Sequence, residues 1–230
     1  MITLALAAHA EQPSRSAIEW AMASGISGGA ALAFFYRALS AGSMGLTATI
    51  GAVLGAAIPA VVGIVSEGWP GWARVAGFVL AGLGIWLISR TEGKERPRGL
   101  GFAVLAGIGF AGFFLCMRQA GGGSALWLAG WARVAALLLT GAVVLAGRSF
   151  GPLPRQSALL GAIAGCLDAS GTALFVRASQ SGRLDVAVML TSLYPAMTVI
   201  LARMILKEHF SRWKVVGLLA GLAAVVLIAA

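Results

Sequence analysis

Long apolar runs follow one another along the chain and are separated by short polar or glycine-rich connectors. Each run is about 20 residues long, the length that an α-helix needs to cross the hydrocarbon core of a membrane. The apolar positions are continuous within each run, so they favour helices over half-buried strands, in which apolar and polar residues alternate. Eight helices are predicted in this way, over residues 18–40, 44–65, 72–89, 99–117, 124–146, 157–176, 184–206 and 213–230.

The composition places these helices in a membrane. Hydrophobic residues make up 59% of the 230 residues and charged residues only 11%, with a mean hydropathy of +0.91. A soluble domain is about one quarter charged and could not bury this much apolar surface. The sequence therefore predicts an all-α, polytopic membrane protein with the lipid bilayer as a partner. It excludes a water-soluble enzyme and a nucleic-acid-binding module.

Charge and cysteine content do not change this picture. The net charge of +9 is typical of the basic loops that fix the topology of membrane proteins. Cys116 and Cys166 lie inside apolar runs and are interpreted as small buried residues rather than as a disulfide or as metal ligands. The chain contains neither a phosphate-binding glycine loop nor a zinc-ligand spacing, so we expect no cofactor and no metal.

The chain repeats itself at a spacing of 140 residues. At this spacing the first three predicted helices align without a gap with the last three, and Phe35 and Arg37 align with Phe175 and Arg177. The shift corresponds to five helices, an odd number, so the two copies are expected to cross the membrane in opposite orientations. This inverted-topology repeat is an architecture common among secondary transporters.

The repeat divides the chain into two predicted domains. Residues 1–90 form an incomplete first copy with three helices, and residues 99–230 form a complete second copy with five. The first copy lacks two opening helices, and residues 1–10 are interpreted as the remnant of the second of these. We therefore expect a ten-helix (5+5) bundle in the full protein, with about 60 further residues before this sequence.

Motifs in the second copy resemble those of a known transporter family. Four of them follow in order: GTALFVRA at 171–178, TSLYPAMT at 191–198, Lys207-Glu208 and GLLAG at 217–221. This series resembles the EamA-type drug/metabolite transporters. Arg133 resembles the arginine that opens the second helix of that family's repeat. The first copy is similar but degenerate, with its proline at Pro59 and Glu67 in its acidic turn.

The resemblance implies a multi-pass protein of the bacterial inner (plasma) membrane and not an enzyme. Such a protein exports small metabolites, amino acids or drugs by alternating access, either passively or driven by protons. The alternative is a non-transporting membrane scaffold or accessory subunit, which the missing helices favour. Pairs of small residues such as Gly217 and Gly221 allow close helix contact and are compatible with a homodimer.

Two charged residues inside predicted helices are candidates for binding a substrate or a proton. Asp168 lies near the middle of its helix, where an ionised carboxylate is costly. It either binds a substrate amine or proton, or is held by Ser170, Thr172 or water in a helix interface. Arg133 meets an anionic substrate group, pairs with Asp168, or reaches the membrane surface with its long side chain.

Two prolines predict helix kinks. Pro195 lies in the middle of a predicted helix, where it frees a backbone carbonyl that must face protein or a wet cavity. Tyr194 and Thr191 are therefore candidate substrate contacts beside this kink, and a kink that serves packing alone is the alternative. Pro59 is the corresponding predicted kink in the first copy.

Overall fold

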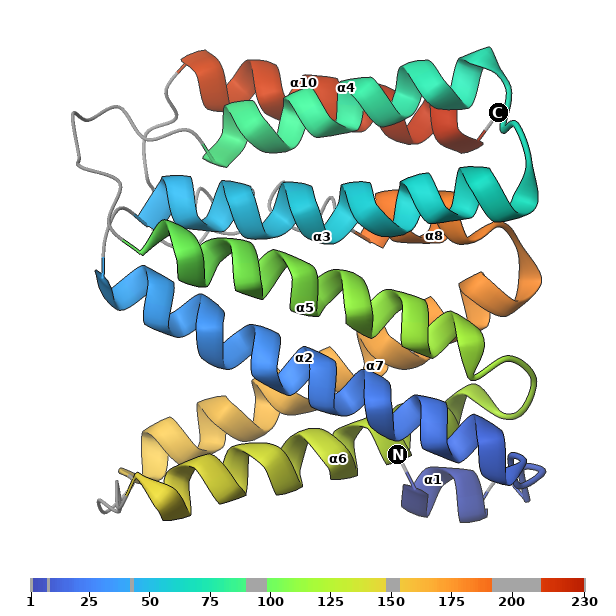
Figure 1. Ribbon diagram of the computed structural model, residues 1–230, viewed down its shortest axis with the longest axis vertical. Helices are drawn as coiled ribbons and strands as arrows, with labels where there is room; N and C mark the ends of the chain where they lie inside the picture. Colours follow the sequence, from blue (N-terminus) through green and yellow to red (C-terminus); the bar gives the residue numbers. More distant parts are fainter. Residues whose placement is uncertain are drawn as a thin grey trace. The chain divides into compact units, whose positions relative to one another are not determined.

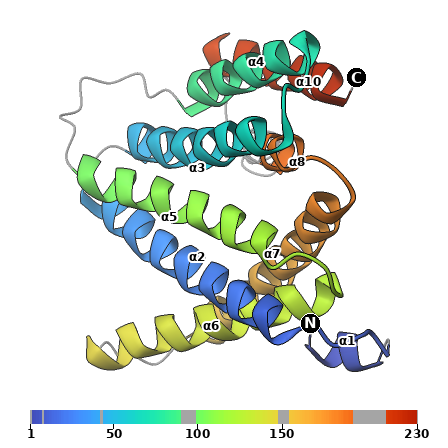
Figure 2. The ribbon, with the colours of Figure 1, turned by 45° about the vertical axis from the view of Figure 1, so that its right-hand side comes forward.

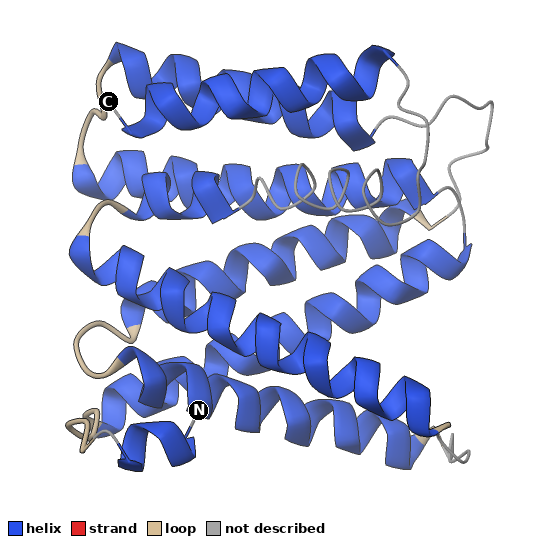
Figure 3. Ribbon diagram, turned by 180° about the vertical axis from the view of Figure 1, so that it is seen from behind, coloured by secondary structure: helices blue, strands red, loops and turns tan. Residues whose placement is uncertain are grey.

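The computed structural model describes residues 2–7, 9–41, 44–89, 99–147, 154–191 and 212–229. Within these residues every regular element is an α-helix and no strand occurs (Figures 1 and 3). The helices are α1 (Ile2–Ala7), α2 (Arg15–Ala41), α3 (Met44–Glu67), α4 (Trp72–Ser89), α5 (Leu100–Gln119), α6 (Ala125–Ala146), α7 (Arg155–Ser181), α8 (Leu184–Thr191) and α10 (Arg212–Ala229). The predicted all-α fold is confirmed.

Several helices have the length and composition of membrane spans. Within the described ranges five helices meet both criteria: Arg15–Ala38, Ile50–Glu67, Leu100–Gln119, Ala125–Ala146 and Arg155–Ser181. Shorter apolar stretches occur in α4 and α10. The chain is thus an all-helical, multi-pass membrane protein, whereas the count of eight spans stays a prediction.

The predicted helix bounds agree with the observed ones to within a few residues at most ends. The largest difference is in α7, which continues five residues beyond the predicted end, to Ser181. Its last turns are polar, but the hydroxyls of Ser179 and Ser181 donate to carbonyls of the same helix at 2.9 and 3.0 Å. These hydroxyls are therefore satisfied without breaking the helix. The helix predicted over 184–206 is described only as far as Thr191.

By packing, the structure divides into two compact units. Unit 1 comprises Met1–Ala30 and Gly112–Ser181, and unit 2 comprises Ala31–Ala111 and Gly182–Ala230. Helices α2 and α5 each contribute to both units. This division is distinct from the two sequence copies, whose boundaries stay a prediction.

In unit 1, α2 packs closely on α5 and α6. A Cβ at Gly25 would collide with the backbone of Ala132 in α6, so only glycine allows this approach. The same turn of α2 also contacts α5, because the hydroxyl of the neighbouring Ser24 donates to the backbone carbonyl of Phe113 at 3.0 Å. The loop between α5 and α6 contains Gly123 with φ +124°, a conformation that other residues rarely adopt.

In unit 2, helices that are 140 residues apart in the sequence lie side by side. Helix α8 runs antiparallel to α3, and α10 runs antiparallel to α4 (Figures 1 and 2). A Cβ at Gly84 of α4 would lie only 2.9 Å from the carbonyl oxygen of Gly217 and 3.0 Å from the nitrogen of Gly221. Ala224 and Ala81, which are the 140-residue counterparts of Gly84 and Gly221, are both fully buried in one core cluster. Small residues on both sides therefore let these two helices cross closely.

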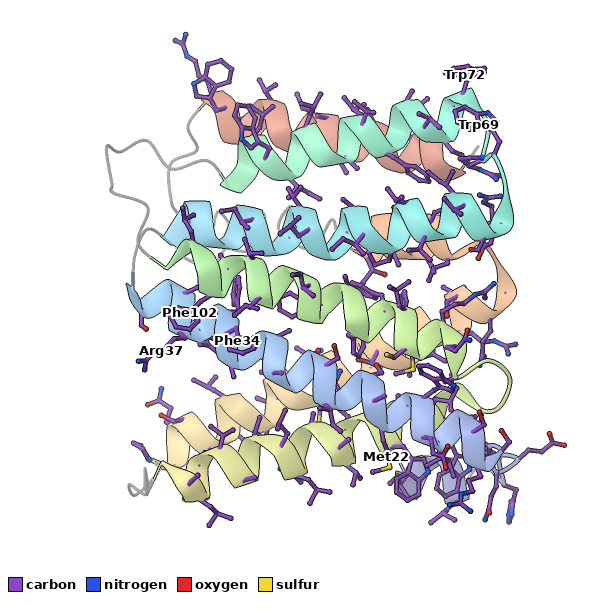
Figure 4. The ribbon with its side chains drawn as sticks, viewed as in Figure 1. Met22, Phe34, Arg37, Trp69, Trp72 and Phe102 are labelled. Carbon is purple, nitrogen blue, oxygen red and sulfur yellow. The ribbon has the colours of Figure 1, made fainter. Side chains whose placement is uncertain are left out.

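Aromatic side chains pack at two other places in unit 2. Phe34 of α2 stacks on Phe102 of α5, with ring centroids 6.3 Å apart (Figure 4). Trp69, in the turn between α3 and α4, and Trp72, the first residue of α4, meet edge to face at 5.1 Å and are both exposed. Exposed tryptophans at helix ends are typical of the membrane–water interface.

Candidate functional site

An arginine–carboxylate pair links α6 and α7 within unit 1. The Arg133 guanidinium forms an ion pair through Nη1 with the carboxylate of Asp168. Its Nη2 donates to the hydroxyl of Thr172 and, at 3.4 Å, to the backbone carbonyl of Asp168. One side chain of α6 thus contacts two successive turns of α7.

The helical spacing explains why these groups meet. Asp168 and Thr172 are four residues apart, so they lie one above the other on the same face of α7. Thr172 is buried, and this face continues to the buried Ser179. On α6, Arg133 lies one turn after the fully buried Ala129, at the edge of the packed face. The pair therefore extends a small-residue helix interface by one turn.

Both charges belong to helices with the length and composition of membrane spans. An isolated charge is costly there, and pairing two opposite charges reduces that cost. The side chains of Arg133 and Asp168 are 31% and 60% exposed. The Nε of Arg133 is buried and has no hydrogen-bond partner within the described part of the chain. The site thus offers an accessible carboxylate and a guanidinium with one donor still unused.

The structure decides between some of the alternatives drawn from the sequence. Arg133 pairs with Asp168, as one of them predicted. Thr172 contacts the guanidinium, and the Ser170 hydroxyl donates at 2.8 Å to the carbonyl of Cys166 in its own helix. Arg133 therefore holds the Asp168 carboxylate. A role of the pair in binding a substrate or a proton stays a prediction.

The other predicted site residues either belong to unit 2 or fall outside the described residues. Thr191 is the last described residue of α8 in unit 2 and is exposed, and its hydroxyl donates at 2.7 Å to the carbonyl of Ala187. Tyr194 and Pro195 lie outside the described residues. Pro59 is buried inside α3, which continues to Glu67, and its kink stays a prediction.

The prediction that both cysteines are buried is wrong for Cys166. Both are free thiols, Cys116 half-buried and Cys166 exposed. Cys166 lies in the N-terminal half of α7, where a Cβ added at Gly161 or Gly165 would also meet no other atom within 4 Å. Apolar sequence alone does not tell which part of a membrane helix faces protein and which faces lipid.

A second charged cluster, which the sequence analysis missed, lies in unit 2 where α3 ends and α8 begins. We call Glu67, Arg183 and Asp185 the turn cluster. Arg183 binds both oxygens of Asp185, from Nε at 3.1 Å and from Nη2 at 2.9 Å. It also donates to the backbone carbonyls of Glu67 at 3.1 Å and Gly68 at 2.6 Å. The Glu67 carboxylate in turn accepts the backbone N–H of Leu184 at 3.0 Å.

The electrostatics of the turn cluster favour a permanently charged arginine. The hydrogen bond with Asp185 raises the pKa of Arg183 above its ordinary value, against the opposing effect of burial. Asp185 is fully buried in the first turn of α8, where a negative charge also suits the helix dipole. The sequence near α8 contains a local sign of this cluster, because Arg183 precedes the acidic Asp185 of the first turn by two residues. The third member, Glu67, lies 116 residues before Arg183 in the chain and cannot be recognised from that local pattern.

Among the described residues, no group of three His, Cys, Asp or Glu side chains is placed to hold a metal ion.

Comparison with known proteins identifies a family. No curated protein and no solved structure matches the chain. The family model described as "EamA-like transporter family" matches residues 97–230, which is more than half of the chain and includes both Arg133 and Asp168. This match agrees with the multi-pass helical fold. The chain therefore belongs to the EamA-like transporter family.

Proposed function

We propose that this protein exports a small metabolite, amino acid or drug across a bacterial plasma membrane by alternating access. Membership of a family of small-molecule membrane transporters supports transport in general. The observation that carries the proposal further is the Arg133–Asp168 pair, which lies between two helices of membrane-spanning length.

A paired arginine and carboxylate suits a site that must bind and release. A ligand anion competes with Asp168 for the guanidinium, and a ligand amine or a proton competes with Arg133 for the carboxylate. A ligand that carries both charges, such as an amino acid, replaces both partners at once and leaves neither Arg133 nor Asp168 with an uncompensated charge in the membrane. The exposed fraction of Asp168 leaves its carboxylate accessible to such a ligand.

The packing of unit 2 supports transport by two inverted halves. The helix pairs α3–α8 and α4–α10 join segments 140 residues apart, and both pairs run antiparallel. Two copies in opposite orientation, related by an axis in the membrane plane, would pair their helices in this way.

The test is transport of labelled metabolites into proteoliposomes, with and without an imposed pH difference. We expect the wild-type protein to move at least one class, and Asp168→Asn to lose about tenfold or more of that rate. Ser170→Ala is the matched control, because its hydroxyl bonds only within α7 among the contacts described. If Asp168→Asn no longer accumulates the labelled metabolite in response to a pH difference but still exchanges it across the membrane, proton coupling would be assigned to Asp168.

A membrane scaffold or accessory subunit is the second candidate. The observation on which it rests is the N-terminal half of α7, where Leu159, Leu160 and Ile163 are all more than half exposed and offer an apolar surface to a partner membrane protein or to lipid. A wild-type protein that moves no tested class, while remaining folded in the same vesicles, would favour this alternative over a transporter.

A further inference from the structure

The turn cluster fastens two segments that are distant in the sequence. We propose that it is a latch, which closes the transport pathway on one side of the membrane and opens once in each transport cycle. This inference rests on the proposed transport function. It goes beyond that function by assigning a mechanical role to Glu67, Arg183 and Asp185.

The first argument is the number of polar contacts that would break together. Arg183 is held by Asp185 on one side and on the other by the backbone carbonyls of Glu67, the last residue of α3, and Gly68. The Glu67 carboxylate adds a bond to the N–H of Leu184, and its Oε2 lies 4.0 Å from the Nε of Arg183. The bonds to Glu67, Gly68 and Leu184 join the end of α3 to the segment that begins α8. The bonds between Arg183 and Asp185 hold the guanidinium in position for them. The contact therefore forms or breaks as one unit.

The second argument is the close fit beneath these bonds. A Cβ at Gly63 would lie 2.9 Å from the backbone nitrogen of Asp185 and 3.0 Å from its Cβ. The first turn of α8 thus rests directly on the backbone of α3, and Asp185 is fully buried. If the two helices part, water reaches the Asp185 carboxylate and solvates it. A contact that is dry and paired when closed, and hydrated when open, has two discrete states rather than a continuous range.

The third argument is the position of the cluster relative to the membrane. Glu67 ends α3, and the exposed Trp69 in the turn and Trp72 at the start of α4 follow it (Figure 4). Exposed tryptophans mark the membrane–water interface. The charges of the turn cluster therefore lie at the height of the membrane surface, where water can replace their partners without entering the hydrocarbon core.

The fourth argument is that the sequence provides this cluster once. The positions 140 residues away from Glu67, Arg183 and Asp185 are Lys207, Ser43 and Gly45. These residues cannot form an arginine held by two carboxylates. In an inverted repeat these positions belong to the opposite side of the membrane, so the repeat does not place a second copy of the turn cluster there. The latch thus favours the state that is closed on the side where α3 ends.

The test measures access to a buried position next to the latch and requires no substrate. Ala187, in the second turn of α8, is 6% exposed. In a protein with Cys116→Ala and Cys166→Ala, the variant Ala187→Cys provides one thiol for a membrane-impermeant maleimide. We expect slow labelling with the latch intact. With Arg183→Gln added, labelling from the side where α3 ends should become about tenfold faster, the change expected when roughly 1.4 kcal/mol of closure is lost.

The matched control is Arg74→Gln, which removes an arginine near the start of α4 in the same unit, outside the turn cluster. It should leave the labelling rate of the Ala187→Cys protein unchanged. Glu67→Gln keeps Arg183 in place and serves as the second variant if Arg183→Gln fails to fold. It should accelerate labelling by a smaller factor, about threefold, because an amide oxygen still accepts the N–H of Leu184.

The latch is refuted if Arg183→Gln and Glu67→Gln label no faster than Arg74→Gln. Equal acceleration from both sides of the membrane, accompanied by a lower melting temperature, also refutes it, because that pattern indicates general loosening of the fold. The labelling result is independent of the transport assay. A one-sided effect in a protein that transports nothing would therefore refute the proposed function while leaving the two-state contact in place.

Discussion

The close approach of α2 to α6 gives a stringent test of the packing in unit 1. Replacing Gly25 by alanine adds a single Cβ, which would lie 2.7 Å from the carbonyl carbon of Ala132 and 2.9 Å from its Cα. Carbon atoms in contact are normally about 3.5–4.0 Å apart. Both contacts are with backbone atoms of α6, which cannot rotate away as a side chain can. One helix must therefore move by about 1 Å or more.

The size of the effect follows from two opposing terms. Overpacking of this kind costs about 1–3 kcal/mol. Alanine is intrinsically more favourable than glycine inside a helix by about 1 kcal/mol, which offsets part of that cost. The repeat provides a matched control, because Gly165 is the 140-residue counterpart of Gly25 and a Cβ there meets no atom within 4 Å. Gly165→Ala gains the intrinsic helix preference of alanine without any overpacking. The free energies of unfolding of the two variants should therefore differ by the full overpacking cost.

The assay is reversible denaturation of both variants in one mixed-micelle system, with helicity or steric trapping as the readout. We expect Gly25→Ala to be less stable than Gly165→Ala by about 1–3 kcal/mol. Equal stability of the two variants would contradict the reasoning, because it would mean that α2 and α6 are not in backbone contact at Gly25. Wild-type protein measured alongside separates the gain at one position from the loss at the other.

Three further outcomes are expected. In melting experiments, Asp168→Asn or Arg133→Gln alone should lower the melting temperature more than the double variant, because a single change leaves one charge without its partner. A double variant that melts at a lower temperature than either single variant would contradict this expectation. Gly123→Ala should destabilise the protein by about 1–2 kcal/mol because of its positive φ, whereas Gly122→Ala, where a Cβ meets nothing, should be neutral in the same assay. Gln180→Ala removes two bonds, of 2.7 and 3.1 Å, to carbonyls of the α5–α6 loop, so hydrogen exchange in that loop should accelerate while that of α3 is unchanged.

The helices could be predicted well because hydrophobic length alone determines them in a membrane. The segment predicted over 72–89 coincides with α4, since Gly68 and Gly71 adopt left-handed conformations that end the preceding helix region. The end of α7 was predicted too early, because Ser179 and Ser181 look like loop residues until their bonds to the helix backbone are known. Polar residues that satisfy themselves within a helix leave no trace in the hydrophobic pattern.

The candidate site was predictable in part. Asp168 and Arg133 stand out because charges are rare in such apolar segments, and their pairing was one of the alternatives. The turn cluster did not stand out, because Glu67 and Arg183 lie in connectors where charges are common. Only the fold shows that they meet across 116 residues and that Asp185 is buried between them. Partnerships between distant connectors depend on helix packing, which a single sequence does not reveal.

The Arg133–Asp168 pair also has a consequence for how the chain is expected to enter the membrane during synthesis. On insertion scales, an arginine or an aspartate at the centre of a lone helix costs about 2.5–3.5 kcal/mol. Helices α6 and α7 follow one another in the chain, and each carries one of the two charges. If the two helices insert one after the other, each brings one unpaired charge into the membrane at this cost. If they insert together as a hairpin, the two opposite charges pair and the hairpin core carries no net charge. The second copy is thus expected to leave the insertion machinery with α6 and α7 already joined, so that folding of this part begins before synthesis ends.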